Sequence, residues 1–179
     1  IEQVQGILTS TIDTFGNPDI LVTSVGTWKM IGIDEDPTIF AKQLNTDLDS
    51  VAKAAMLPIF IFNQFFLKRG GGFIVDISSH AAEGVLEGNL TYSPSKASVK
   101  AFIENLRNEN GSNSPVTISR IIAQLVDTPK NRESFPDIKI EDWSGAVQTK
   151  DMSDWIAGNV GNKDVEPEKL FKSKIVIKI

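Results

Sequence analysis

The chain has 179 residues, 41% of them hydrophobic and 23% charged, a composition that suits one globular domain spanning residues 1–179. Its net charge of −5 gives no electrostatic reason to bind nucleic acid or an anionic membrane, and its apolar runs are shorter than the roughly 20 residues that a membrane span needs. With no cysteine and one histidine, disulfides and a cysteine nucleophile are excluded and no metal site is expected. The redox compartment stays open, with an intracellular, cytoplasmic setting as the default expectation.

The first part of the chain predicts a helix, a strand and a long helix. Residues 2–15 place apolar side chains near one helical face and end at the turn sequence GNPD. Residues 20–26 begin with an uninterrupted apolar run, which is typical of a parallel strand covered on both faces. A helix is predicted over residues 38–67, with Asp36 as its N-cap. Pro58 lies inside its apolar run and predicts a kink or a break there.

The second part alternates strands and helices. A strand is predicted over residues 73–79, and a helix over residues 93–108 carries an apolar stripe at helical spacing that should pack on the sheet. A β-branched strand follows at residues 117–123, then a short helix at residues 151–160. The end of the chain, KIVIKI at residues 174–179, predicts an edge strand. The whole pattern indicates an α/β protein.

A serine, a tyrosine and a lysine lie where they are predicted to meet. Tyr92 and Lys96 are four residues apart on the predicted helix, so they share one of its faces. A phenol, with a pKa of about 10, is a poor base at neutral pH, and a fixed ammonium nearby would lower that pKa. Ser79, at the end of the preceding strand, would hold a carbonyl or alcohol oxygen beside the phenol. The YxxxK spacing alone also suits an ordinary amphipathic helix, so the hypothesis depends on the ordered set of three.

The ordered segments resemble a known catalytic sequence. GGGFIVDISS, the thirteen positions from Ser79 to Tyr92, and YSPSKASVKAF are very similar to the catalytic segment of the short-chain dehydrogenase/reductase family. The resemblance implies a Rossmann-like doubly wound parallel sheet and an NAD(P)-dependent oxidoreductase. By resemblance Ser79 orients the substrate oxygen, Tyr92 passes the proton, and Lys96 lowers the pKa of the tyrosine and holds the nicotinamide ribose. The implied substrate is a small carbonyl or alcohol compound, the cofactor is NADP or NAD without distinction, and a homo-oligomer is expected.

Three further residues stand where the family contacts its cofactor. The first strand ends in TSVG, where the family has NNAG, so only Gly26 is retained. Gly26 would let a dinucleotide approach the backbone, or it would serve an ordinary turn. Val126 and Thr128 stand where a Val/Ile and a Thr contact the nicotinamide amide, although AQ replaces the PG pair that precedes them in the family. Thr128 is explained equally well by a turn before the next proline.

The substrate side of the resemblance is less definite. Relatives carry an asparagine that completes a catalytic tetrad through a water, and Asn45 and Asp47 both fit its local pattern. Both lie further from Ser79 in the sequence than the family spacing implies, so neither is assigned the role. The stretch TPKNRESFPDIKIEDW resembles the matching part of quinoid dihydropteridine reductase, a short-chain relative. Residues 132–150 would form a mobile lid over the substrate.

The glycine-rich turn that cradles a dinucleotide pyrophosphate is missing, because no strand is followed by GxGxxG or GxxxGxG. The family match begins before its fourth strand, so the sheet is expected to lack the first three strands. Either an N-terminal portion precedes these residues in the whole protein, or the chain is a truncated relative whose open edge a partner covers. Two functions therefore stand: an NAD(P)-dependent oxidoreductase acting through Ser79, Tyr92 and Lys96, or a non-catalytic structural or interaction subunit of a larger assembly.

Overall fold

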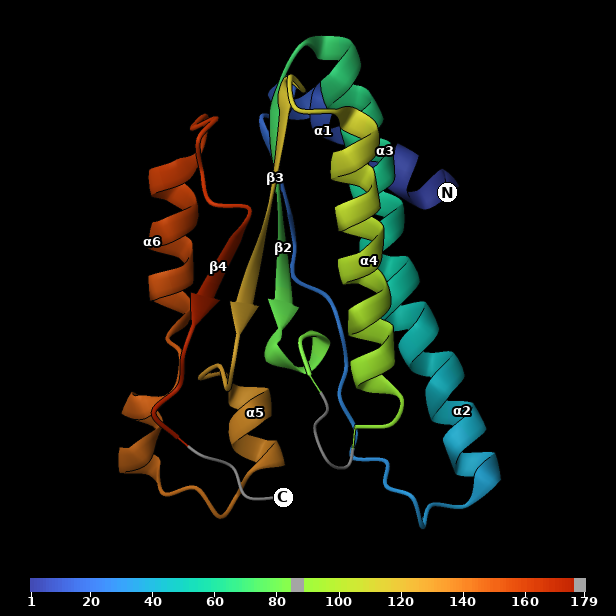
Figure 1. Cartoon of the computed structure of the whole chain (residues 1–179), viewed down its shortest axis with the longest axis vertical. Coiled ribbons are helices and arrows are strands. Elements are labelled where there is room, and N and C mark those ends of the chain that lie inside the picture. Colours follow the sequence, from blue (N-terminus) through green and yellow to red (C-terminus); the bar gives the residue numbers. More distant parts are fainter. Residues whose placement is uncertain (85–88, 176–179) are drawn as a thin grey trace.

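Four parallel strands form the centre of the structure, which describes residues 1–84 and 89–175. In this computed structural model, strands that are neighbours in the sequence are also neighbours in the sheet (Figure 1). This arrangement confirms the predicted α/β class with a Rossmann-like parallel sheet. In sheet order the strands are β1 (Ile20–Thr23), β2 (Gly72–Ser79), β3 (Val116–Ala123) and β4 (Glu168–Phe171).

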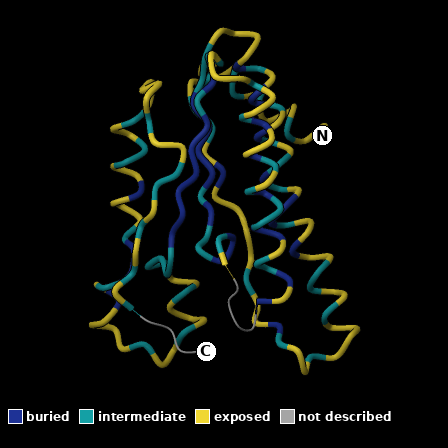
Figure 2. Tube along the Cα trace, viewed as in Figure 1, coloured by how far each residue is buried: buried dark blue, intermediate teal, exposed yellow. Residues whose placement is uncertain are grey.

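Helices cover both faces of the sheet. The helices α3 (Ala54–Arg69) and α4 (Tyr92–Asn110) lie on one face, and α6 (Thr149–Asn159) lies on the other (Figure 1). The central strands between them are largely buried, as Figure 2 shows in dark blue. Burial on both sides fits the apolar runs within these strands, residues 73–75 of β2 and 121–123 of β3. The other α-helices are α1 (Glu2–Phe15), α2 (Pro37–Asp47) and α5 (Pro129–Ser134).

The core consists of one apolar cluster on each face. Val99 and Ile103 of α4 are buried against Ile74 of β2, which confirms that the predicted apolar stripe packs on the sheet. On the opposite face Val75 of β2 packs in a cluster with Met152 of α6. Successive residues of β2 therefore enter different clusters, because side chains alternate across a strand.

The long helix is interrupted before its proline and not at it. Between α2 and α3 the chain forms a π-helical segment, η1 (Leu48–Lys53), and Pro58 lies inside α3. The predicted break at Pro58 is therefore wrong in position. The proline lacks the N–H that would bond the carbonyl of Ala54, which is the first residue after the π-helical turns. The irregular hydrogen bonding of the helix thus lies about one turn before Pro58, in the π-helical segment.

The helical run Pro37–Arg69 is long and apolar enough, by length and composition, to cross a membrane. Polar residues interrupt the apolar stretches of this run, so the length of uninterrupted apolar sequence does not reveal it. In the structure Ile59, Phe62 and Phe66 of this run are buried in the core on the sheet. A core helix meets the same criteria, so the run is weak support for a membrane segment.

The ends of the sheet differ in part from the prediction. The last strand was expected at residues 174–179, of which 176–179 lie outside the described residues. Within the part that is described, the fourth strand is β4, and it pairs with β3 so that Glu168 lies beside Arg120. At the other end β1 pairs only with β2 among the described residues, so its outer edge is open as expected.

Candidate active site

The predicted site residues meet at one edge of the sheet. Ser79 is the last residue of β2 and lies beside Ala123, the last residue of β3. Gly26 follows the end of β1, and Val126 follows the end of β3. Because all strands are parallel, these positions share the carboxyl edge, where open α/β sheets bind their ligands.

Ser79 and Tyr92 interact across this edge. The Ser79 hydroxyl accepts a hydrogen bond of 3.2 Å from the amide of Ala81 and so caps a short 3₁₀ helix, η2 (His80–Ala82). The same hydroxyl lowers the pKa of the phenol of Tyr92, the first residue of α4. The end of β2 and the start of α4 therefore lie close enough for the two side chains to influence each other, while their roles in a reaction stay a prediction.

Lys96 lies one helical turn from the tyrosine but is held by the backbone. Its ammonium nitrogen is 6.0 Å from the centroid of the Tyr92 ring. It donates hydrogen bonds to the carbonyls of Val25, at 3.0 Å, and Ile77, at 3.4 Å. Burial lowers the pKa of Lys96, and the nearby carboxylate of Asp76 acts in the opposite direction.

The pKa of Tyr92 is raised above its ordinary value and not lowered. Burial is the main cause, and the carboxylates of Asp47 and Asp76 add to it, while the hydrogen bond from Ser79 opposes them. The expectation that Lys96 lowers the pKa of this phenol therefore does not hold in this structure. The physical reason is that burial disfavours the charged phenolate and two carboxylates add to this effect, whereas the ammonium of Lys96 donates to two backbone carbonyls.

Gly26 lies next to the lysine in a conformation that suits glycine. Its φ of 144° falls where L-residues with a side chain are strained. A Cβ at this position would lie 3.5 Å from both Cε of Lys96 and Cγ2 of Val51. The missing side chain therefore leaves the backbone of Gly26 close to the side chains of Lys96 and Val51.

Val126 and Thr128 lie in the loop after β3. The Thr128 hydroxyl accepts a 3.2 Å hydrogen bond from the amide of Asn131 and caps α5. The carbonyl of Val126 accepts a 2.8 Å hydrogen bond from the side-chain amide of the same asparagine. The turn-forming role that the sequence left open for Thr128 is thus present, and contact with a cofactor stays a prediction for both residues.

The predicted lid touches the loop after β1. Phe135, which follows α5, stacks on Trp28 with ring centroids 5.4 Å apart. Trp28 in turn donates a hydrogen bond to the side chain of Asn89. Since β1 and β3 flank β2, this stack joins the two loops on either side of the strand that carries Ser79. The rest of the predicted lid contains a 3₁₀ helix, η3 (Ile140–Gly145), and the start of α6.

Two buried carboxylates near the tyrosine were missed or left unassigned by sequence reasoning. Asp76 of β2 accepts a 2.8 Å hydrogen bond from the hydroxyl of Thr23, and burial raises its pKa while Lys96 acts against this. The signal was an acidic residue inside an otherwise apolar strand. Asp47, at the end of α2, is fully buried, and Gln43 donates a 2.9 Å hydrogen bond to one of its oxygens. Its other oxygen has no hydrogen-bond partner among the described residues.

Comparison with known proteins matches this arrangement to one family. The model of the family described as short chain dehydrogenase matches residues 1–139. An uncharacterized oxidoreductase of Staphylococcus saprophyticus is 24% identical over 183 residues, which cover 99% of this chain and 71% of that protein. This chain also matches four further staphylococcal oxidoreductases, and in these the match covers 53 to 60% of the relative's length.

Solved structures share the fold at low sequence identity. A 7α-hydroxysteroid dehydrogenase complexed with NADH and 7-oxo glycochenodeoxycholic acid has a TM-score of 0.79 at 18% identity, over 96% of this chain and 69% of that one. ElxO with NADP bound has a TM-score of 0.77 at 19% identity, over 94% of this chain and 71% of that one. This chain therefore has the fold of about seven tenths of each of those proteins.

Proposed function

Because the chain belongs to the short-chain dehydrogenase/reductase family of NAD(P)-dependent oxidoreductases, we propose that it catalyses hydride transfer involving a small carbonyl or alcohol substrate. The single observation that carries the proposal is that Ser79 at the end of β2 and Tyr92 at the start of α4 come together at the carboxyl edge of the sheet, with the ammonium of Lys96 6.0 Å from the tyrosine ring. Lys96 lies one turn further along the same helix. The structural neighbours bound to NADP or NADH support a nicotinamide cofactor, without favouring either one.

In the proposed mechanism Tyr92 is the proton donor for carbonyl reduction. Its raised pKa keeps the phenol protonated at neutral pH, so it is an acid before the reaction. Ser79 holds the carbonyl oxygen beside the phenol, and the proton passes from Tyr92 to that oxygen as the carbonyl carbon becomes an alcohol carbon. When bound, the reduced nicotinamide supplies the hydride that this carbon accepts.

The chain offers part of a cofactor site. Lys96 has three N–H donors, and the carbonyls of Val25 and Ile77 accept from two of them, which leaves the third for a ribose hydroxyl. Gly26, without a side chain, permits a ligand to approach beside this ammonium. By position at the same edge, Val126 and Thr128 are candidates for the nicotinamide amide. The ammonium of Lys96, which lies beside the backbone of Gly26, is suited to donate a hydrogen bond to a ribose hydroxyl.

The second candidate function is a non-catalytic subunit of a larger assembly. The sequence departs from the family at TSVG and at AQ, and the hydroxyl of Thr128 already caps α5. The open edge of β1 would then be the surface that a partner strand covers.

Nicotinamide fluorescence distinguishes the two functions. NADPH or NADH is mixed with the full-length protein, and binding is expected for the enzyme. An absence of binding at high protein concentration would favour the subunit.

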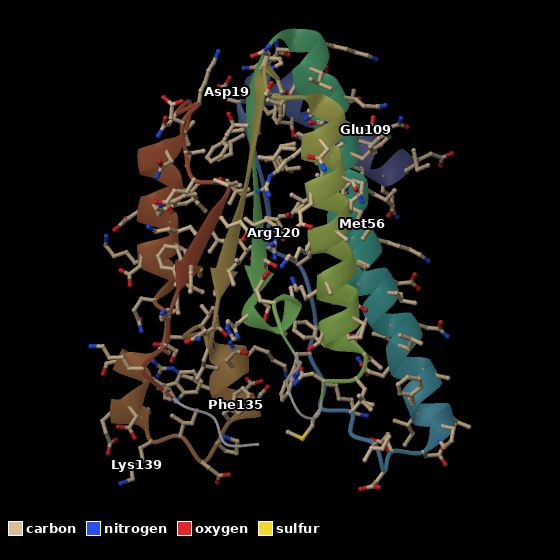
Figure 3. The ribbon with its side chains drawn as sticks, in the orientation of Figure 1. Asp19, Met56, Glu109, Arg120, Phe135 and Lys139 are labelled. Atoms are coloured by element: carbon tan, nitrogen blue, oxygen red, sulfur yellow. The ribbon has the colours of Figure 1, made fainter. Side chains whose placement is uncertain are left out.

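The substitution Tyr92→Phe tests the role of the phenol. It removes the proton donor but keeps the ring, so cofactor affinity should persist while turnover falls by roughly 10² to 10⁴-fold. The matched control is Glu109→Gln, an exposed change at the far end of the same helix (Figure 3), which should leave both quantities unchanged. Retained turnover in Tyr92→Phe would refute the assigned role.

A further inference from the structure

Arg120 is a fully buried arginine in the middle of β3. Figure 3 shows it between the strands and α4. One terminal nitrogen donates to the carboxylate of Glu168 in β4. The other donates to the hydroxyl of Ser78, at 3.1 Å, and to the carboxylate of Glu83, at 2.5 Å. A single guanidinium thus joins β4, β3 and the end of β2.

The two groups on the second nitrogen flank the turn that carries Ser79. Ser78 directly precedes Ser79, and Glu83 directly follows η2, the short helix that Ser79 caps. The amide of Glu83 donates a 3.0 Å hydrogen bond to the carbonyl of His80, so the turn is closed on itself. Arg120 therefore holds both ends of this turn.

The same network fixes the turn to the helix that carries the tyrosine. The second oxygen of the Glu83 carboxylate accepts a hydrogen bond from Lys100. Lys100 lies about two turns along α4 from Tyr92. Arg120 and Lys100 thus both donate hydrogen bonds to the carboxylate of Glu83, which connects the turn after Ser79 to α4.

A stabilising role alone does not explain a guanidinium at this place. Its side chain is wholly buried, whereas its partners Glu83 and Glu168 retain 21% and 36% of their side-chain exposure. Its Nε has no hydrogen-bond partner among the described residues. Buried ion pairs are generally no more stable than apolar side chains of similar volume, but the planar fork of arginine fixes the direction of its bonds.

We propose that Arg120 is a positioning residue, which sets the Ser79 hydroxyl against Tyr92 by holding Ser78 and Glu83. The catalytic consequence rests on the proposed function, but the geometric claim does not. Loss of the hydrogen bond between Arg120 and Glu83 should allow the turn at residues 79–83 to move, which would weaken the interaction between Ser79 and the phenol. Glu168 holds Arg120 from the opposite side, toward β4, so its loss leaves the grip on the turn in place.

The single tyrosine of this chain provides a direct readout. Replacing it with 3-fluorotyrosine, whose phenol is more acidic, places one fluorine signal at position 92 and brings its titration to a pH that the fold tolerates. The Ser79 hydroxyl lowers the pKa of this phenol, so Ser79→Ala gives the reference shift for its loss, and that shift should be upward.

The test compares Glu83→Ala with its matched control Glu168→Ala, because each removes one carboxylate from Arg120. Glu83→Ala should raise the pKa of the fluorophenol in the same direction as Ser79→Ala, and the double variant should shift it no further. Removal of a negative charge by itself lowers the pKa of a phenol, so an upward shift reports the lost hydrogen bond. Glu168→Ala should cause no upward shift.

An unchanged or lowered pKa in Glu83→Ala, or a shift that adds fully to that of Ser79→Ala, would overturn the proposal. If Glu83→Ala fails to fold by circular dichroism, Ser78→Ala replaces it, since it removes only the 3.1 Å bond. That variant should give a smaller upward shift, and no shift would count against the proposal.

Turnover of the full-length protein separates this proposal from the proposed function. Glu83→Ala should lower kcat several-fold while the Kd of NADPH stays unchanged, because the groups assigned to the cofactor are untouched. If the unmodified protein does not bind the cofactor, the proposed function fails. The fluorine titration still decides whether Arg120 positions Ser79.

Discussion

At the scale of single residues, burial and two nearby carboxylates together raise the pKa of Tyr92. The sequence predicted that Lys96 lowers the pKa of Tyr92, but its ammonium donates hydrogen bonds to the backbone carbonyls of Val25 and Ile77. Asp47 and Asp76 act on the phenol instead and raise its pKa together with burial. The phenol is therefore suited to donate a proton, and oxidation of an alcohol, which needs the phenolate, should accelerate as the pH rises.

The substitution Asp47→Asn should lower the pKa of Tyr92, because it removes a buried negative charge that favours the neutral phenol. The fluorine titration measures this shift directly. The pH profile of alcohol oxidation should move to lower pH by the same amount. The control is Asp49→Asn in η1, whose carboxylate is exposed and paired with Lys53. A pKa that rises or stays fixed in Asp47→Asn would contradict the assignment.

Gly26→Ala should weaken both the fold and the affinity for the cofactor. The positive φ strains any side chain, so the free energy of unfolding should fall by about 1 to 3 kcal/mol. The new methyl group would also lie against Lys96, which should raise the Kd of NADPH. Urea denaturation and nicotinamide fluorescence measure the two effects. As control, Gly6→Ala in the middle of α1 meets nothing within 4 Å and should leave the protein as stable or slightly more stable.

At the scale of elements, the contact between α3 and the start of β2 is set by a missing side chain. A Cβ on Gly72 would lie 2.2 Å from the ring of Phe66, which is fully buried in the core. The helix can therefore approach the strand only because this residue is glycine. The three consecutive glycines at residues 70–72 cannot be distinguished by sequence pattern. Only at Gly72 would a Cβ clash with a buried ring.

Gly72→Ala should lower the free energy of unfolding by about 1 to 3 kcal/mol, because the ring of Phe66 must move within a packed core. The neighbouring Gly71→Ala is the control, since a Cβ there would meet only the carbonyl of Pro115 at 3.5 Å. Urea denaturation of both variants measures the difference. Equal stabilities would show that the ring is free to yield.

At the scale of the whole molecule, β1 and β4 are the two edge strands of the sheet among the described residues, and β1 is the edge at which the rest of a longer sheet was expected. Among the described residues this strand has a neighbour on one side only, and Val22 is 42% exposed. Open edges pair with other strands unless charge or cover prevents it. We therefore expect this chain, on its own, to associate through β1, in line with the expected homo-oligomer.

Val22→Lys should reduce this association, because a lysine on the edge strand disfavours pairing with a second copy. Size-exclusion chromatography with light scattering, over micromolar concentrations, gives the molar mass. Val160→Lys is the control, since Val160 is similarly exposed but follows α6, away from the edge. An identical mass for Val22→Lys and the unmodified chain would exclude the β1 edge as the contact.

Local patterns in the sequence determined the elements and the core of the site. The cap at Asp36 forms as predicted, with its carboxylate accepting from the amide of Thr38 at 2.7 Å. The four-residue spacing of Tyr92 and Lys96, and the position of Ser79 at a strand end, are local as well. Such features follow from helix and strand periodicity, which depends on near neighbours in the chain.

Tertiary structure alone decided how distant groups act on one another. The charge of Asp47 on Tyr92, and the bonds of Arg120 to Glu83 and Glu168, join segments 37 to 48 residues apart in the sequence. Burial and the direction of each bond come from packing, which a one-dimensional pattern does not encode. The sequence therefore showed which ionisable and hydroxyl groups are available at this edge. The packed fold decided which of them act on the pKa of Tyr92.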